Sequence, residues 1–415
     1  MPMAEITFRR IFHPVGQGAF FTEHFVNSQN RIHIVYDCGS MNRTRVNNEI
    51  SCFANSNIKG DHIACIFISH FDMDHVNGLD KLRKVFTVND KTFVFVPFFY
   101  EEVYVYLSQF NDNYLKAYNI LKRFIKKTGA QLIMVSPLTN DNRPVEPFVI
   151  NEEKGIIDNR KEIASGTPIH IQDSEKNVIW KYIPYNITTN QTIEGIVLEG
   201  LQKTGAIKGC RFNIELLSYP TKGMSKEEIK LMASKRQKLR RIFTKLGKGS
   251  YSENINMNSL QLLSLPNDPT SCTDYCRYSI CDSYFGDYYK WNKGYTKYKF
   301  ENAKIYPGSC LYTGDTFANS DDFWKAFDTI LVSNLTRNYS RLSLFQIPHH
   351  GSKHSNNNRI VSDDRIYATF TNFDANRKKQ IYDPNINLQF YLHQKPLILI
   401  TEEEVFRFEE CWTIK

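Results

Sequence analysis

The sequence lacks the apolar runs that membrane proteins need. No stretch approaches the roughly 18 consecutive apolar residues of a membrane-spanning helix. The segment Met1–Arg10 has neither an apolar core nor a small-residue cleavage site, so we expect no secretory signal. Cysteine is sparse, with 9 in 415 residues, which excludes a small disulfide-rich scaffold. We therefore expect a cytoplasmic protein with reduced thiols and no membrane partner.

The chain also lacks internal repeats and low-complexity linkers. Hydrophobic residues make up 41% of it, which is enough for a sizeable core and excludes wholesale disorder. Strand-like runs occur near both ends of the chain, which favours one interrupted domain over several separate ones. We therefore expect a single α/β domain over residues 1–415, with inserts at about 98–130, 186–256 and 266–303, the last rich in cysteine and aromatic residues and irregular.

Most of the predicted elements are strands. Apolar, aromatic or β-branched runs bounded by turn residues predict them at Ile6–Phe12, Ala19–Val26, Ile32–Tyr36, Ile63–Ser69, Leu132–Val135, Val178–Ile183, Leu260–Leu265, Ser309–Tyr312, Thr329–Val332, Leu344–Ile347, Leu397–Ile400 and Val405–Phe408. Between Asp112 and Lys127, apolar residues instead recur at helical spacing until Gly129 ends the pattern.

The chain carries a surplus of basic residues, 52 against 44 acidic ones, or +8. Such a surplus attracts polyanions without identifying one. The segment Lys222–Lys248 predicts a charged helix, with five basic side chains between Lys235 and Arg241. This helix either contacts the phosphates of a nucleic acid or another phosphodiester, or presents a solvated face, because Glu227 and Glu228 interrupt it.

The most informative stretch follows the apolar run Ile63–Ser69. The next six residues, His70-Phe71-Asp72-Met73-Asp74-His75, hold four side chains that commonly ligate metals. At a strand end the backbone turns, so His70 and Asp72 suit one ion, and Asp74 and His75 a second. Gly78 permits a close backbone approach as a helix begins at Val76 or Asn77. The alternative is a polar loop that caps this helix.

Two further strand ends carry the same residue types. Asp315 follows the run Leu311–Tyr312 in the sequence LYTGD. His349 and His350 follow another strand in QIPHHGS. Asp315 alone would be an ordinary turn residue, and a lone histidine an ordinary imidazole. Three strand ends with histidine and aspartate together indicate a two-metal hydrolase.

These motifs resemble those of metallo-β-lactamase-fold hydrolases. Within that superfamily the chain is most similar to the ComEC-like branch, the hydrolase domain of a DNA-uptake competence protein. That branch reads SH-x-D-x-DH-x-x-G, then N-x-S before a strand, then LLTGD, then PHHGS. The corresponding residues here are SHFDMDHVNG at Ser69–Gly78, Asn258 and Ser259, LYTGD at Leu311–Asp315, and PHHGS at Pro348–Ser352. The motifs VGQG at Val15–Gly18 and DCG at Asp37–Gly39 match its opening hairpin and turn.

The resemblance implies an αββα sandwich that holds two divalent ions, zinc or manganese, at one edge. It implies that His70 and Asp72 ligate one ion and Asp74 and His75 the other, that Asp315 bridges them, and that His349 or His350 completes the second site. It implies catalytic roles for Asp74, His349 and His350 and a supporting role for Asp37. Asn258, Ser259, Ser352 and Lys353 are candidates for substrate contacts.

The chain departs from the wider superfamily at Asp72, where the superfamily has histidine. It also lacks a clear mid-chain histidine ligand, because His170, in the strand-like TPIHI, fits a structural residue. The ion site of His70 and Asp72 is then poor in ligands. Its larger share of oxygen ligands moves the preference from Zn²⁺ toward Mn²⁺.

The leading hypothesis is a metal-dependent phosphodiesterase or nuclease that uses a metal-bridging hydroxide. Hydrolysis of another ester, an amide or a peptide bond is the first alternative, because one fold supports many chemistries. A second alternative is a regulatory partner with a degenerate site. A bacterial defence operon, in which such a chain acts beside other proteins, is one setting for either role.

Overall fold

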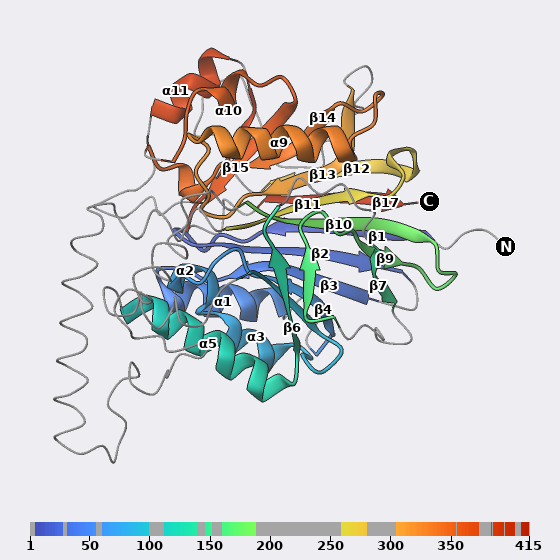
Figure 1. The fold of residues 1–415 in the computed structure, drawn as a ribbon, viewed down its shortest axis with the longest axis vertical. Coiled ribbons are helices and arrows are strands. Elements are labelled where there is room, and N and C mark those ends of the chain that lie inside the picture. The colour runs from blue at the N-terminus through green and yellow to red at the C-terminus, as the bar shows by residue number, and fades with distance from the viewer. Residues whose placement is uncertain are drawn as a thin grey trace, which may run out of the picture.

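The structure, a computed structural model, describes the chain in thirteen parts (Figure 1). These are residues 5–27, 31–54, 60–98, 112–138, 146–151, 160–187, 259–279, 304–353, 355–372, 383, 385–393, 395–402 and 408–414. The predicted basic helix at Lys222–Lys248 and the predicted substrate contact Asn258 lie outside the described residues. No helix among the described residues is long and apolar enough to cross a membrane.

The first sheet has nine strands in the order β12-β17-β1-β2-β3-β4-β5-β6-β8. Strands β12, β17, β1, β2 and β3 pair antiparallel, and β3 to β8 pair parallel. The strands are β1 (Ile6–Phe12), β2 (Phe20–Val26), β3 (Arg31–Cys38), β4 (Ile63–Phe67), β5 (Phe93–Pro97), β6 (Gln131–Ser136), β8 (Glu162–Ala164), β12 (Cys272–Ser279) and β17 (Phe408–Ile414).

The second sheet has eight strands in the order β16-β15-β14-β13-β11-β10-β9-β7. The run from β13 to β16 is parallel, whereas β9, β10, β11 and β13 pair antiparallel. The strands are β7 (Phe148–Asn151), β9 (Ile169–Gln172), β10 (Val178–Asn186), β11 (Leu260–Pro266), β13 (Ile305–Tyr312), β14 (Arg341–Gln346), β15 (Ile366–Asn372) and β16 (Leu397–Ile400). The described fold is therefore α/β with two mixed sheets.

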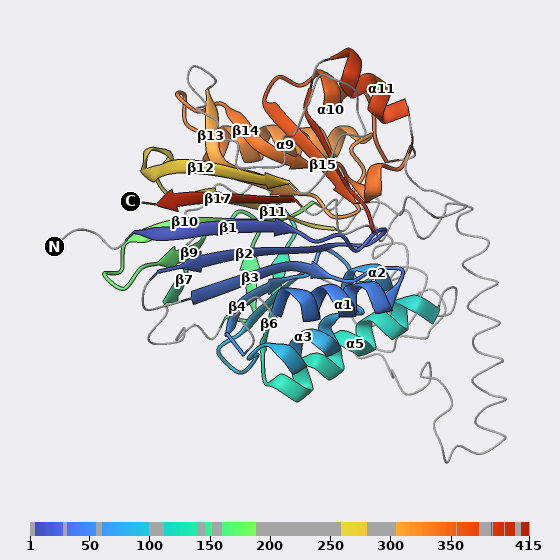
Figure 2. The same cartoon turned by 180° about the vertical axis from the view of Figure 1, so that it is seen from behind.

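Three hydrophobic clusters hold the sheets and helices together. One contains side chains of both sheets, such as Phe8 and Phe67 from the first and Trp180 and Leu262 from the second. The other two join each sheet to helices that Figures 1 and 2 show on opposite sides of the molecule. The helices are α1 (Arg43–Ala54), α2 (Met73–Val76), α3 (Leu79–Val85), α5 (Asp112–Thr128), α9 (Asp321–Asn334), α10 (Arg359–Ser362) and α11 (Asn385–Leu392), with short 3₁₀ turns η2 (Pro269–Ser271) and η4 (His349–Gly351).

Three sequence predictions are wrong in detail. The predicted strand Thr329–Val332 is the last part of α9, because Phe323, Phe327 and Ile330 give one buried helical face and Ser320 caps the first turn. The predicted helix start at Val76 or Asn77 is too late, because Asp72 caps α2 at Met73. Part of the predicted irregular insert at 266–303 forms β12, which pairs with β17.

A buried ionic cluster joins the two sheets. Arg10 of β1 is fully buried and ion-pairs with Glu23 of β2 at 2.6 Å and with Glu410 of β17. Its guanidinium also donates to the Gly308 carbonyl at 2.9 Å and to Ser264 Oγ at 3.1 Å in the second sheet. Glu23 and Glu410 lie in the first sheet, so this one cation bonds to both sheets across the core.

Candidate metal centre

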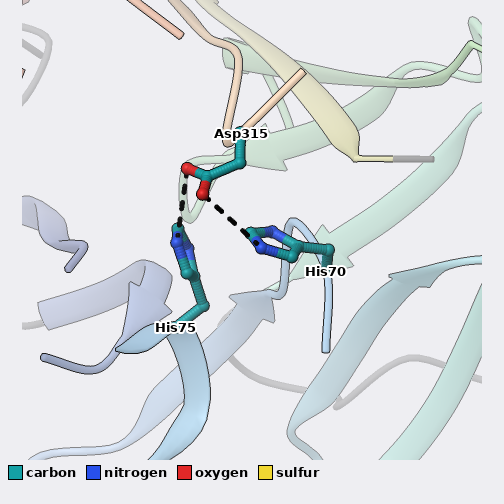
Figure 3. A group of neighbouring side chains, drawn as sticks. All are labelled: His70, His75 and Asp315. Atoms are coloured by element: carbon teal, nitrogen blue, oxygen red, sulfur yellow. Dashed lines mark ion pairs between the residues drawn. The ribbon is translucent and has the colours of Figure 1, made fainter. Parts of the chain in front are cut away.

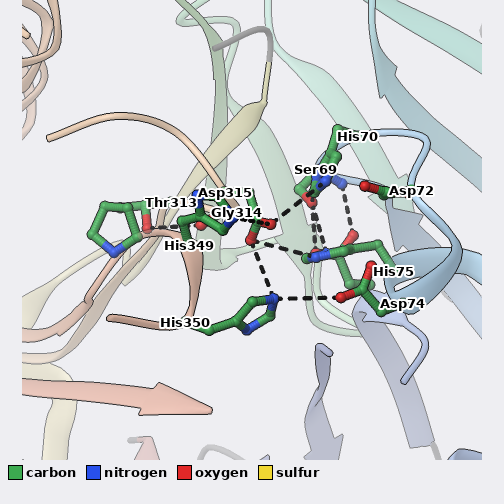
Figure 4. Close-up of polar contacts among 12 residues, drawn as sticks. Ser69, His70, Asp72, Asp74, His75, Thr313, Gly314, Asp315, His349 and His350 are labelled. Atoms are coloured by element: carbon green, nitrogen blue, oxygen red, sulfur yellow. Dashed lines mark hydrogen bonds and ion pairs between the residues drawn. The ribbon is translucent and has the colours of Figure 1, made fainter. Parts of the chain in front are cut away.

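The site lies where several strands end. His70 follows β4, Asp74 and His75 lie in α2 just beyond it, and Asp315 follows β13. The pair His349–His350 forms η4, just beyond β14. Strand β4 runs parallel to β3, and β13 runs parallel to β14, so each pair of strands delivers its polar loops at one edge. Figure 4 shows the side chains from these separate segments pointing toward one another.

The Asp315 carboxylate lies at the centre of the group. Its Oδ1 is 3.4 Å from His75 Nε2 and 3.6 Å from His350 Nε2. Its Oδ2 is 3.8 Å from the Nε2 atoms of both His70 and His349. Figure 3 shows His70 and His75 approaching the two oxygens from different directions. Each carboxylate oxygen therefore faces its own pair of imidazoles.

Two overlapping sets of side chains have the spacing of metal ligands. The first set is His70, His75 and Asp315, and the second is Asp74, His75 and His350. Within each set the ligand atoms lie within 4.8 Å of one another. His350 Nε2 is 3.6 Å from Asp74 Oδ2, which completes the second set. One imidazole nitrogen has one lone pair, so His75 Nε2 can serve only one ion.

Buried polar atoms in this group have no hydrogen-bond partner within the described part of the chain. They are His70 Nε2, His75 Nε2, His350 Nε2 and Asp315 Oδ1. An unpaired buried polar atom costs on the order of 1–3 kcal/mol, so four together are unfavourable unless something binds them. Divalent cations bind imidazole nitrogen and carboxylate oxygen, so the residues present fit a metal ion.

Asp37 and Ser69 fix the orientation of two of these imidazoles. Asp37 Oδ2 accepts from His75 Nδ1 at 2.8 Å and from Ser69 Oγ at 2.7 Å, and its Oδ1 accepts from the Ser69 N–H at 2.7 Å. Because the Ser69 hydroxyl proton goes to Asp37, its oxygen accepts from His70 Nδ1 at 3.0 Å. Both histidines therefore keep a proton on Nδ1, so Nε2 is the nitrogen that carries the lone pair for a metal ion in the neutral imidazole. Asp37, for which a supporting role is predicted from the sequence, thus bonds directly to His75 and through Ser69 to His70.

The two histidines of η4 have different surroundings. The His350 side chain is only 3% exposed, between Asp74 and Asp315, whereas the His349 side chain is 20% exposed and forms a 2.7 Å hydrogen bond between Nδ1 and Ser355 Oγ. Both have left-handed backbones, with φ of 50° and 53°. Non-glycine residues hold this conformation only at a cost of about 1–3 kcal/mol each, and such strain concentrates at functional sites.

Charge and burial separate the pKa values of the site. Burial, reinforced by the neighbouring His75, lowers the pKa of His70 to about 3. Burial also acts to lower the pKa of His75, but Asp315 and Asp37 outweigh it and raise that pKa well above the usual value. Burial acts to raise the pKa of Asp74, but the imidazole of His350, 3.6 Å away, and the charge of His75 lower it to about 2. Asp74 is thus an anion at neutral pH, and His70 is a neutral imidazole.

Asp72 stands apart from both metal-ligand sets. Its Oδ1 accepts from the Met73 N–H at 3.0 Å and so caps α2. Burial, followed by the charge of Asp74, raises the pKa of Asp72 to about 7. Of the predicted pair, His70 therefore belongs to one of the two ligand sets, whereas Asp72 belongs to neither.

The candidate substrate residues divide between buried and exposed positions. Ser259 is fully buried and Ser352 is 3% exposed, whereas Lys353 is exposed. The Ser352 N–H donates to the His349 carbonyl at 2.9 Å, within the turn that follows η4. Of these three residues, Lys353 alone presents its side chain to solvent.

Two supporting residues were not predicted from the sequence. The sequence motif includes Ser69 but predicts no role for it, although its hydroxyl joins Asp37 to His70. Ser355 lies six residues beyond His349, and no motif marks it. The adjacency of Ser69 to His70 was an available signal, whereas the contact of Ser355 depends on how the turn folds.

Comparison with models of known protein families gave no match to this chain, and comparison with curated proteins gave none either. The assignment of function therefore depends on the geometry of the site and on the motifs in the sequence.

Proposed function

We propose that this chain is a dinuclear-metal hydrolase of phosphodiesters, with the αββα sandwich of the metallo-β-lactamase superfamily. The observation that carries the proposal is the single carboxylate of Asp315, whose two oxygens each face a separate pair of imidazoles at 3.4–3.8 Å. A shared carboxylate between two sets of ligands suits two ions close together. Two such ions, when bound, would activate water near neutral pH and offset the charge of a phosphoryl group.

The proposed ligand sets follow from burial and orientation. His75, His350 and Asp74, with Asp315 Oδ1, form the fuller set, and all of them are buried. His70 and Asp315 Oδ2 form the other, with Asp72 as the nearby carboxylate, whose pKa is raised by burial and then by the charge of Asp74. The second set is poorer in ligands, which agrees with the departure of Asp72 from the superfamily pattern.

His349 is the residue that we assign to the substrate. Its side chain is 20% exposed, whereas those of His70, His75 and His350 are 3% exposed or less. Ser355 holds its ring through Nδ1, so Nε2 points toward Asp315 and the substrate side. At this place His349 can donate a proton to the leaving oxygen of a diester.

The test begins with metal content and a panel of substrates. The purified chain should hold about two divalent ions and should hydrolyse bis-p-nitrophenyl phosphate or a nucleic acid strand. Asp315→Asn should lose most of its bound metal, and its activity should fall at least 100-fold, because both ions lose a ligand. The matched control is Asp322→Asn, since Asp322 is an exposed carboxylate in the first turn of α9.

A second pair of variants separates ligand from proton donor. His350→Ala should lose metal, whereas His349→Ala should keep both ions and lose turnover. Cleavage of casein and of no diester would contradict the proposal in favour of a peptidase. Two bound ions with no turnover of any substrate would contradict it in favour of a regulatory partner.

A further inference from the structure

A buried glutamine links the two loops that carry Asp315 and the histidine pair. Gln346 is the last residue of β14, three positions before His349, and is only 4% exposed. Its side-chain Oε1 accepts from the Thr313 N–H at 2.8 Å and from the Gly314 N–H at 3.2 Å. Thr313 Oγ1 donates in return to the Gln346 carbonyl at 3.1 Å. One amide oxygen thus accepts from the backbone N–H groups of both residues that precede Asp315.

The same turn also packs against Ser69, the residue before His70. Gly314 has φ of +58°, and a Cβ there would lie 2.6 Å from Ser69 Cβ and 3.2 Å from Ser259 Cβ. The Gly314 carbonyl also accepts from the His349 N–H at 3.1 Å. The turn therefore has no room for a side chain at position 314, and Gln346 holds it through two hydrogen bonds. Its position determines where the Asp315 carboxylate lies relative to the four imidazoles.

We propose that Gln346 is a positioning residue for the metal centre. It holds the turn before Asp315 by accepting from two backbone N–H groups, and it acts on the site through that turn. This inference rests on the proposed function, because it matters only if Asp315 binds ions. Groups that orient a ligand affect metal affinity by about 10–100-fold when they are removed, and we expect Gln346 to lie in this range.

Two substitutions distinguish this role from simple packing. Gln346→Met keeps the length of the side chain but removes the acceptor, so two buried N–H groups lose their partner and Asp315 becomes free to shift. Gln346→Glu keeps an oxygen at the same place, and a carboxylate accepts from two N–H groups as well as an amide does. Gln131→Met is the matched control, because Gln131 opens β6 at the end of the strand opposite to the loops of the site, and its amide donates to the Asp90 carbonyl.

The experiment measures affinity for Mn²⁺ and Zn²⁺ in the chelator-treated chain by competition with a chromophoric chelator, together with the melting temperature of the metal-free chain. Gln346→Met should bind 10–100-fold more weakly, and Gln346→Glu and Gln131→Met should stay within about threefold of the unsubstituted chain.

Three results would overturn the inference. In the first, Gln346→Met binds like the unsubstituted chain, even if its melting temperature falls, and the residue then only stabilises the fold. In the second, Gln346→Glu weakens binding as much as Gln346→Met, so the acceptor is not what matters. Either result leaves the proposed function standing if the unsubstituted chain binds two ions. In the third, the unsubstituted chain binds no ion, and both proposals fail together.

Discussion

Asp72 stands at a position where the metallo-β-lactamase-fold hydrolases that the sequence resembles carry histidine. Its carboxylate caps α2 and lies near enough to Asp74 and His75 for their charges to shift its pKa, after the larger effect of burial. A carboxylate oxygen is a harder ligand than an imidazole nitrogen and favours Mn²⁺ over Zn²⁺. The identity of this one side chain should therefore set the metal preference of the poorer ligand set.

We expect Mn²⁺ to activate the unsubstituted chain more than Zn²⁺, and Asp72→His to reverse that order. Rates of diester hydrolysis after reconstitution with each ion measure the ratio. Asp72→Asn is the control, because it keeps both an oxygen and the helix cap, whose loss costs about 0.5–2 kcal/mol. An unchanged ratio of the two rates in Asp72→His would show that Asp72 does not govern the choice of ion.

At the scale of elements, the antiparallel strands β1 to β3 bury an unusual pair of histidines. His24 of β2 lies opposite His33 of β3, with their Nδ1 atoms 2.5 Å apart. His24 also contacts Thr22 through Nε2, and His33 contacts Asp61 at 3.0 Å. Burial, followed by the charge of His33, lowers the pKa of His24 well below its usual value. Burial lowers the pKa of His33 too, although Asp61 partly offsets it.

This pair should make the fold sensitive to acid. Below about pH 6.5 both imidazoles bind a proton in the unfolded chain, whereas burial keeps them neutral in the folded chain. The contribution of the pair to the free energy of unfolding is therefore fully present above that pH and is lost as the pH falls. The melting temperature of the chelator-treated chain should therefore fall between pH 7.5 and 5.5, and by less in His24→Leu. Exposed His393 supplies the control variant His393→Gln. Parallel pH profiles for the original chain and His24→Leu would contradict this account.

On the scale of the whole molecule, one cation between the sheets balances two carboxylates. Arg10 pairs with Glu23 and Glu410, and the hydroxyls of Tyr182 and Tyr312 donate to Glu23 at 2.5 and 2.7 Å. All five groups are at least nine-tenths buried. Removing one partner of such a buried pair leaves an uncompensated charge in the core.

Arg10→Met should therefore destabilise the fold by about 3–5 kcal/mol, because two buried carboxylates lose their cation. Glu410→Gln should cost clearly less, since Arg10 keeps Glu23 and the amide oxygen still accepts a hydrogen bond. Equilibrium unfolding in urea measures both differences. A loss below about 1 kcal/mol for Arg10→Met would mean that water or a neighbouring group compensates the two carboxylates.

How much of this could be predicted from the sequence depends on the range of each interaction. The run Ile63–Ser69 was predicted as a buried strand because its pattern is local, and β4 has every residue buried. Thr329–Val332 has the composition of a strand, but a helical face that begins at Phe323 overrides it. The position of β12 beside β17 depends on pairing across more than 100 residues, which no local pattern records.

The same distinction holds for the site. His70, Asp74 and His75 lie within six residues, so one motif was enough to predict that they converge. The motifs also marked Asp315 and the histidine pair, but they left open which histidine binds an ion, and the burial of His350 decides our proposal. The bond from Gln346 to the Thr313–Gly314 turn spans more than 30 residues and depends on the parallel pairing of β13 and β14. Its role could be seen only in three dimensions.

The pairing of β1 with β17 also has a consequence for the order in which the chain is made. Residues 6–12 leave the ribosome long before their antiparallel neighbours, which are residues 408–414. Until these emerge, one edge of β1 stays open, and Arg10 has only one of its two acidic partners. Pairings so distant in sequence also form slowly. The nascent chain must therefore keep the unpaired edge of β1 from aggregating until β17 has been made, and assistance from a chaperone during translation would protect this strand in that interval.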